Sequence, residues 1–139
     1  MLTNRAMDRV LRDLQRFIRQ WDEPVVGRYK SDPFMTLISC LLSLRTKDAT
    51  TAAASQRLFA LARTPKAMLA LSLPTLEQAI YPVSFYRNKA RAIHGICQTL
   101  LERYGGQVPS DLDELLTLKG VGRKTANLVV TLAFHKPGI

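Results

Sequence analysis

Apolar side chains recur along most of this 139-residue chain at intervals of three and four residues. In an α-helix this spacing places them on one face, whereas a half-buried strand would show strict alternation, which no segment does. We therefore predict an all-α fold. The first such segment spans residues 4–21, with apolar positions at Met7, Val10, Leu11, Leu14, Phe17, Ile18 and Trp21.

Helix start signals divide the rest of the chain. Asp32 followed by Pro33 predicts an N-cap and first helical residue, opening a buried helix that runs to Leu44. Ser110 with Asp113 resembles a capping box and predicts another helix ending at Leu118. The remaining helices are predicted at 46 or 48 to 62, 65–71, 74–80, 87–104 and from 123 onward.

Charge and cysteine content limit the function. Lys and Arg number 20 against 11 Asp and Glu, and the net charge of +9 favours a polyanionic partner, most simply nucleic acid. No apolar run spans a bilayer and no secretory signal is present, so we expect an intracellular protein of the cytoplasm and nucleoid, or of the nucleus in a eukaryote. Cys40 and Cys97 are too few for a disulfide framework or a four-cysteine metal site, and Cys40 is predicted to be a core thiol.

A glycine turn between two short apolar helices is the most informative motif. Gly120, Val121 and Gly122 lie in it, and the glycines allow positive φ and close approach of the backbone to a ligand. The turn leads into a helix N-terminus, where unpaired N–H groups favour an anion such as a DNA phosphate. A purely structural turn is the alternative, but the charge of the chain favours phosphate binding.

Lys124 follows this turn, in the first turn of the predicted helix. A neutral lysine amine is a nucleophile that can form a Schiff base with a sugar carbonyl. The alternative is an ordinary lysine that contacts phosphate or solvent, and the local pattern alone does not decide between the two.

The segment from Leu118 to Asn127 resembles the signature of the endonuclease III family of helix-hairpin-helix DNA glycosylases and apurinic/apyrimidinic lyases. Further segments match the family in order and spacing, so that the resemblance covers roughly residues 30 to 135. These segments are 32–34, 41–48, 64–68, 85–90 and 106–109.

The resemblance implies a six-helix barrel at residues 29–139 with the helix-hairpin-helix at 110–135, preceded by an N-terminal helix and linker at 1–28. It also implies base-excision repair: removal of oxidised pyrimidines from double-stranded DNA, and cleavage at abasic sites by β-elimination. The oligomeric state is not implied by any of these features.

The family's site residues can be carried over by position. The nucleophilic lysine falls on Lys124, and the residues that fill the gap left by an extruded base fall on Arg45 and Phe85. An arginine can stack and donate hydrogen bonds, and a phenylalanine can serve as an apolar wedge. The resemblance assigns the phosphate clamp to Gly120, Val121 and Gly122, with Lys119 and Arg123 beside them.

Several positions depart from the family pattern. Lys119 replaces a usual proline, and Ser84 stands where glycine is common. The catalytic aspartate lies in the family a few residues past the position of Ile139, and the cysteine cluster that holds a 4Fe–4S centre comes later still. Cys40 and Cys97 do not match that cluster, so no cofactor is predicted in this chain. Without the aspartate we expect impaired catalysis.

Two functions follow from the sequence. In the first, the chain is the N-terminal portion of a bifunctional DNA glycosylase and lyase. In the second, it is a non-catalytic helix-hairpin-helix module that only binds DNA. Lys124, Arg45 and Phe85 favour the first, because a pure binding module needs none of them.

Overall fold

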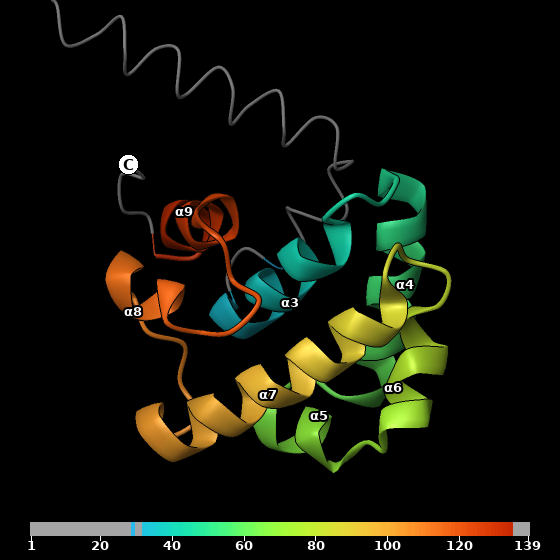
Figure 1. The fold of residues 1–139 in the computed structure, drawn as a ribbon, viewed down its shortest axis with the longest axis horizontal. Helices are drawn as coiled ribbons and strands as arrows, with labels where there is room; N and C mark the ends of the chain where they lie inside the picture. Colours follow the sequence, from blue (N-terminus) through green and yellow to red (C-terminus); the bar gives the residue numbers. More distant parts are fainter. Residues whose placement is uncertain (1–28, 30–31, 135–139) are drawn as a thin grey trace, which may run out of the picture.

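The computed structural model describes residue 29 and residues 32–134 of the chain (Figure 1). The described residues form helices without a single strand, which confirms the predicted all-α fold. The predicted helix at 4–21 and the segment 1–28 to which it belongs lie outside the described residues. The helices are α3 (Pro33–Ser43), α4 (Asp48–Leu61), α5 (Pro65–Ala70), α6 (Leu73–Ile80), α7 (Tyr86–Tyr104), α8 (Leu112–Leu116) and α9 (Arg123–Leu132).

Side-chain caps fix where α3 and α5 begin, and the Ser72 hydroxyl caps α6 in the same way. The Asp32 carboxylate accepts a hydrogen bond from the Met35 N–H at 3.1 Å, and the Thr64 hydroxyl accepts one from the Ala67 N–H at 3.1 Å. In α3 and α5 a proline follows the cap. Proline has no backbone N–H, so the helix start has one unpaired donor fewer, and the proline ring holds φ near its helical value. Both starts agree with the sequence prediction.

The predicted start and end of α8 were wrong. The helix spans Leu112–Leu116, with Asp111 rather than Ser110 as the N-cap residue in the extended conformation, and the Asp111 side chain makes no cap hydrogen bond. The helix also ends before Leu118, because the next backbone N–H groups bond three residues back instead of four and tighten the chain into the hairpin turn.

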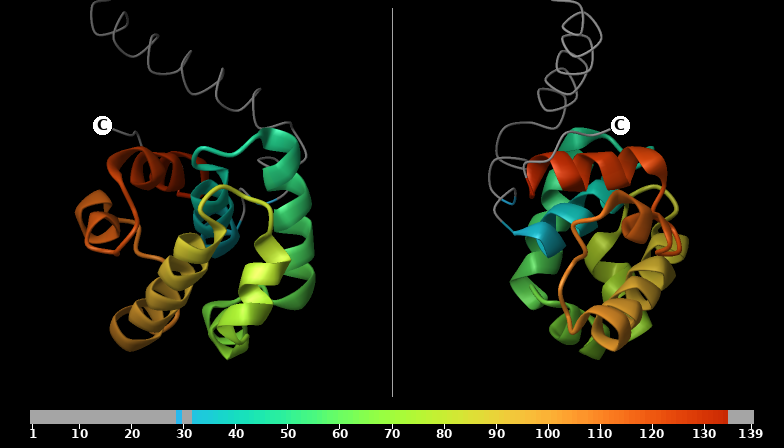
Figure 2. Two further views of the ribbon diagram at one scale, coloured as in Figure 1. Left: turned by 45° about the vertical axis from the view of Figure 1, so that its right-hand side comes forward. Right: turned by 90° about the vertical axis from the view of Figure 1, so that its left-hand side faces the viewer.

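Helix α3 is the centre of the described fold (Figures 1 and 2). It packs against α4, α7 and α9, while α5 and α6 cover α7, and α8 packs on α9. The side chains of Leu37, Ile38 and Leu42 are fully buried, as expected for a helix that is enclosed by three others. The loop that follows α3 and the loop that precedes α7 are therefore attached to buried, well-packed helices.

The described helices include none that is both long and apolar enough to cross a membrane. Cys40 of α3 and Cys97 of α7 are both buried free thiols, which confirms the prediction for Cys40. Burial raises the pKa of each thiol to about 12. At neutral pH both therefore stay protonated and pack as small apolar side chains.

Candidate active site and DNA interface

The hairpin between α8 and α9 requires glycine at one of its two glycine positions. Gly120 has a φ of +94°, in the left-handed region, and a Cβ at this position would lie 3.2 Å from Cβ of Ala92. Gly122 has a φ of −90° and a ψ of 177°, which any residue adopts, and a Cβ there would meet no atom within 4 Å. The fold needs Gly120, whereas Gly122 leaves open space beside the backbone.

Val121 fixes this turn to the protein. Its side chain is almost completely buried, and its N–H donates to the carbonyl oxygen of Leu118 at 3.1 Å. Gly122 is then the N-cap of α9, and it has no side chain to accept from the first N–H groups of that helix. An uncapped N-terminus of a ten-residue helix carries the positive end of the helix dipole, which suits an anion.

The three cationic residues predicted at the hairpin are all exposed. Lys119 lies in the turn, and Arg123 and Lys124 lie in the first turn of α9, where the sequence predicted Lys124. Their charges surround the same uncapped helix end. Such an arrangement can bind a phosphate by a combination of backbone N–H groups and side-chain cations.

Lys124 lies close to the central helix. Burial is the main influence on the pKa of the Cys40 thiol and raises it, and the positive charge of Lys124 acts in the opposite direction. Cys40 belongs to α3 and Lys124 to α9, so this influence agrees with the packing of the two helices against each other. Arg45 follows Cys40 by five residues and lies just past the C-terminal end of α3.

Arg45 and Phe85 are brought together from loops that are forty residues apart in the sequence. Arg45 follows α3 and Phe85 precedes α7, and the Arg45 Cζ atom lies 6.0 Å from the centroid of the Phe85 ring. Both side chains are exposed, and Phe85 has 57% of its surface accessible to solvent. The exposed ring is available to contact a ligand.

Both residues also have a strained backbone. Arg45 has a φ of +58° and Phe85 a φ of +55°, and no other non-glycine residue in the described part of the chain has a positive φ. Residues other than glycine adopt this backbone conformation at a cost of about 1–3 kcal/mol, and only where the surrounding structure imposes it. Strain of this kind gathers at sites that bind or react, so the pair is a candidate for such a site.

Sequence reasoning missed a polar cluster beneath the pair. Lys89, Thr46 and Ser84 hydrogen bond with one another or with the loop of Arg45. One signal could have found it: Lys89 lies four residues before Ile93, on the buried face of α7, where a charged residue interrupts the apolar pattern. A lysine on that face requires polar partners.

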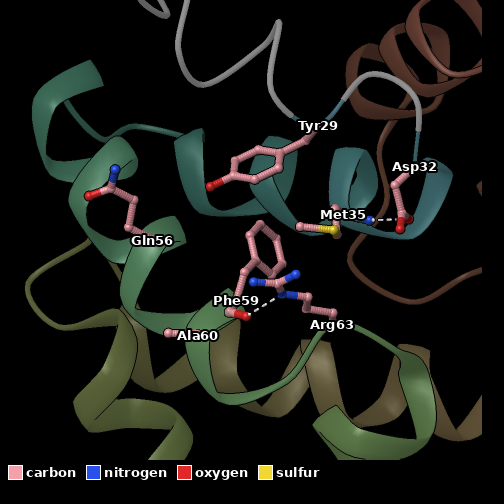
Figure 3. Close-up of a pocket in the computed structure, with 7 residues that line it drawn as sticks. All are labelled: Tyr29, Asp32, Met35, Gln56, Phe59, Ala60 and Arg63. Atoms are coloured by element: carbon pink, nitrogen blue, oxygen red, sulfur yellow. Dashed lines mark hydrogen bonds between the residues drawn. The ribbon is translucent and has the colours of Figure 1, made fainter.

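Two cavities in the described part of the chain lie away from the predicted site residues. A cavity of about 410 Å³ lies between the start of α3 and the second half of α4, and a smaller one of about 290 Å³ lies beside it. Neither is lined by a residue that the sequence predicted for the site. The larger cavity is shown in Figure 3 and is lined by Tyr29, Asp32, Met35, Gln56, Phe59, Ala60 and Arg63.

The described part of the chain contains no set of side chains that could bind a metal ion. No group of three or more His, Cys, Asp or Glu side chains that could hold a metal ion is found there, and the two thiols are separate and buried. The described residues therefore do not fit the 4Fe–4S cluster that the family resemblance implies for longer relatives, and no step is derived through one.

An all-α fold in which a glycine turn joins two helices, the second without a side-chain cap, defines a helix-hairpin-helix protein. The chain belongs to the HhH-GPD superfamily of base excision DNA repair proteins, whose sequence profile matches residues 38–136. Its curated relatives include endonuclease III of Thermotoga maritima, 46% identical over 110 residues, which are 79% of this chain and 52% of the relative. Endonuclease III of Escherichia coli K12 is 42% identical over 78% of this chain and 52% of its own length.

Solved structures agree with this assignment. A non-covalent endonuclease III–DNA complex superimposes with a TM-score of 0.72 at 41% identity, covering 87% of this chain and 60% of that one. A trapped endonuclease III–DNA covalent intermediate gives a TM-score of 0.73 at the same identity and coverage. The predicted family and fold are thus confirmed, and the chain spans about half the length of the curated relatives that it matches.

Proposed function

We propose that this chain carries the DNA-binding surface and the nucleophile of a bifunctional DNA glycosylase and abasic-site lyase that acts on oxidised pyrimidines. The observation that carries the proposal is the pairing of Arg45 with Phe85: two exposed side chains, both with left-handed backbone, held 6.0 Å apart from separate loops. An enzyme that extrudes a base must fill the gap that the base leaves in the stack, and this pair offers a cation and an apolar wedge for that purpose.

In this proposal the hairpin positions the DNA strand. A phosphate lies at the N-terminus of α9, close to the backbone of Gly122, while Lys119 and Arg123 contribute positive charge. These contacts are to the sugar–phosphate backbone, so they fix where the strand lies without selecting a base sequence. Recognition of the damage is then left to the gap-filling pair and the pocket that receives the base.

Lys124 supplies the reactive group. At an abasic site its neutral amine attacks the C1′ aldehyde carbon and a C–N bond forms. The carbonyl oxygen takes up one proton from the amine and one from solvent and departs as water, which leaves a protonated Schiff base. Loss of a proton from C2′ then expels the 3′ phosphate and breaks the strand. When a damaged base is still attached, the same attack must displace that base, and the family's catalytic aspartate is not among these 139 residues.

Borohydride trapping tests the proposal directly. The 139-residue protein is incubated with duplex DNA containing an abasic site, borohydride is added to reduce any C=N bond, and covalent adducts are separated by denaturing electrophoresis. We expect a slowly formed adduct that Lys124→Ala abolishes. Because displacement of an intact base is expected to need the aspartate, base release from an oxidised pyrimidine should be much slower than trapping.

Lys119→Ala is the matched control, since this lysine is also exposed and lies in the same hairpin. It should weaken DNA binding and leave the adduct detectable at saturating protein. An adduct that survives Lys124→Ala would show that another amine reacts. DNA binding with no adduct at all would exclude the lyase function for this chain and leave the alternative, a non-catalytic DNA-binding module.

A further inference from the structure

The loops that carry Arg45 and Phe85 are hydrogen bonded to each other. The Ser84 hydroxyl donates to the carbonyl oxygen of Arg45 at 2.6 Å, and the Ser84 N–H donates to the Thr46 hydroxyl at 3.0 Å. Each bond joins the residue before the wedge to the turn that holds the arginine. Moving either loop would break both contacts, so the two loops form one unit.

A buried ammonium group holds this unit from below. Lys89, in the first turn of α7, has only 9% of its surface exposed. Its Nζ donates to the carbonyl oxygen of Leu42 at 3.1 Å, to that of Leu44 at 2.5 Å and to the Thr46 hydroxyl at 3.2 Å. The two carbonyls belong to the end of α3, where helical hydrogen bonds run out and a cation is favourable.

Thr46 is where the two sets of bonds meet. Its hydroxyl oxygen accepts from both the Lys89 ammonium and the Ser84 N–H, and its own proton points to the Leu44 carbonyl at 3.3 Å. The start of α7, the turn after α3 and the loop before α7 thus share one hydroxyl group. Its removal, or removal of the ammonium, would leave buried polar groups without partners.

We propose that Lys89 is a positioning residue for the gap-filling pair: its ammonium group locks the turn of Arg45 to the loop of Phe85 so that both side chains enter the DNA gap together. This inference rests on the proposed function, because it takes the gap-filling roles of Arg45 and Phe85 as given. Lys89 itself is buried beneath the pair and touches no DNA.

The cost of keeping this lysine supports a role beyond packing. An apolar side chain would be cheaper on the buried face of α7, since removing a cation from water is unfavourable, and burial lowers the pKa of Lys89 to about 8. Three directed donors are what an apolar residue cannot supply. They also oppose the relaxation of Arg45 and Phe85 out of their left-handed conformations.

The test compares binding to two duplexes, one intact and one with a tetrahydrofuran abasic analogue opposite 2-aminopurine. Lys89→Met keeps the length and the apolar stem and removes all three donors. We expect its preference for the abasic duplex over the intact one to fall about tenfold, since hydrogen bonds to a charged group are worth that order of magnitude. Intact-DNA affinity should stay unchanged, and the 2-aminopurine signal that reports gap filling should shift toward that of free DNA.

Arg63→Met is the matched control. Arg63 also donates to a carbonyl at a helix end, through Nε to the Phe59 oxygen at 3.0 Å, but it caps α4. It should leave the abasic preference as it is. Ser84→Ala removes only the inter-loop bond to Arg45 from a half-buried position, and should lower the preference in the same direction but less. This variant carries the test if Lys89→Met does not fold.

Phe85→Ala separates the two levels of the proposal. If Phe85→Ala lowers the abasic preference while Lys89→Met and Ser84→Ala leave it intact, the positioning role is overturned and the gap-filling role stands. If Phe85→Ala also leaves it intact, the gap-filling role fails, and the inference fails with it. A preference that falls in all three variants but not in Arg63→Met establishes the inference.

Discussion

Lys89 illustrates what a single position adds to a helical pattern. The apolar face of α7 is read from the sequence without difficulty. Periodicity does not explain the lysine within it, because its hydrogen-bond partners lie more than forty residues away in the sequence. Arg45 and Phe85 present the same difficulty. Their left-handed backbone is imposed by neighbours and no glycine marks it, so the family resemblance could assign their positions but not their geometry.

The lowered pKa of Lys89 predicts a pH effect on stability. Between about pH 8, the value in the folded protein, and its usual pKa of 10.5, the unfolded chain binds a proton on this amine that the folded chain does not. The contribution of Lys89 to the free energy of unfolding therefore rises with pH across this interval, and is constant below it. Lys89→Met lacks this contribution.

Urea denaturation of the wild type and of Lys89→Met from about pH 7 to about pH 9.5 measures this effect. The difference between the two proteins isolates Lys89 from the other groups that titrate, including the thiols. We expect the wild type to gain relative to the variant as the pH rises above 8. A difference that stays constant over the range would contradict the lowered pKa.

At the scale of elements, start signals were more informative than end signals. Asp32 with Pro33 fixed the beginning of α3 because cap and proline act within one turn. The limits of α8 were predicted less well: Ser110 was a plausible cap, but Asp111 takes the position, and the shift to three-residue hydrogen bonds before Leu118 is a response to the hairpin turn rather than to local residue preference.

Gly120 of the hairpin and Gly95 of α7 predict a contrast in folding. Gly120→Ala forces a side chain into the left-handed region and toward Ala92, and should destabilise the protein by about 1–2 kcal/mol or more. Gly95→Ala, in the exposed interior of α7 with no atom near the new Cβ, should instead stabilise it by about 0.5–1 kcal/mol. Urea denaturation followed by circular dichroism compares them, and equal effects would refute the strain at Gly120.

Gly122 gives the corresponding prediction for binding. Its φ suits alanine and the Cβ would meet nothing in the protein, so Gly122→Ala should fold with a stability loss of at most about 1 kcal/mol at the N-cap. If a phosphate approaches this backbone, the added methyl group should weaken DNA affinity about tenfold or more. Fluorescence anisotropy with an intact duplex measures it. Unchanged affinity would remove Gly122 from the phosphate clamp.

At the scale of the whole molecule, the net charge of +9 predicts salt-sensitive DNA binding, but not nine contacts. The cations placed at the candidate interface are Lys119, Arg123, Lys124 and Arg45. At about 0.9 per neutralised phosphate, they predict a slope of log affinity against log salt of roughly −3 to −4, and Lys119→Ala should reduce its magnitude by about one. Anisotropy titrations at several salt concentrations decide this, and a slope near zero would exclude phosphate binding as the main interaction.

The bonded loops bear finally on how fast and how tightly the protein engages damage. A flexible wedge would have to become ordered on the DNA, and that lost freedom would subtract from affinity. Here Ser84, Thr46 and Lys89 order both loops when the chain folds. Conformational entropy is thus lost before any encounter with DNA, and under the proposed function the energy of contact remains available for separating stacked bases.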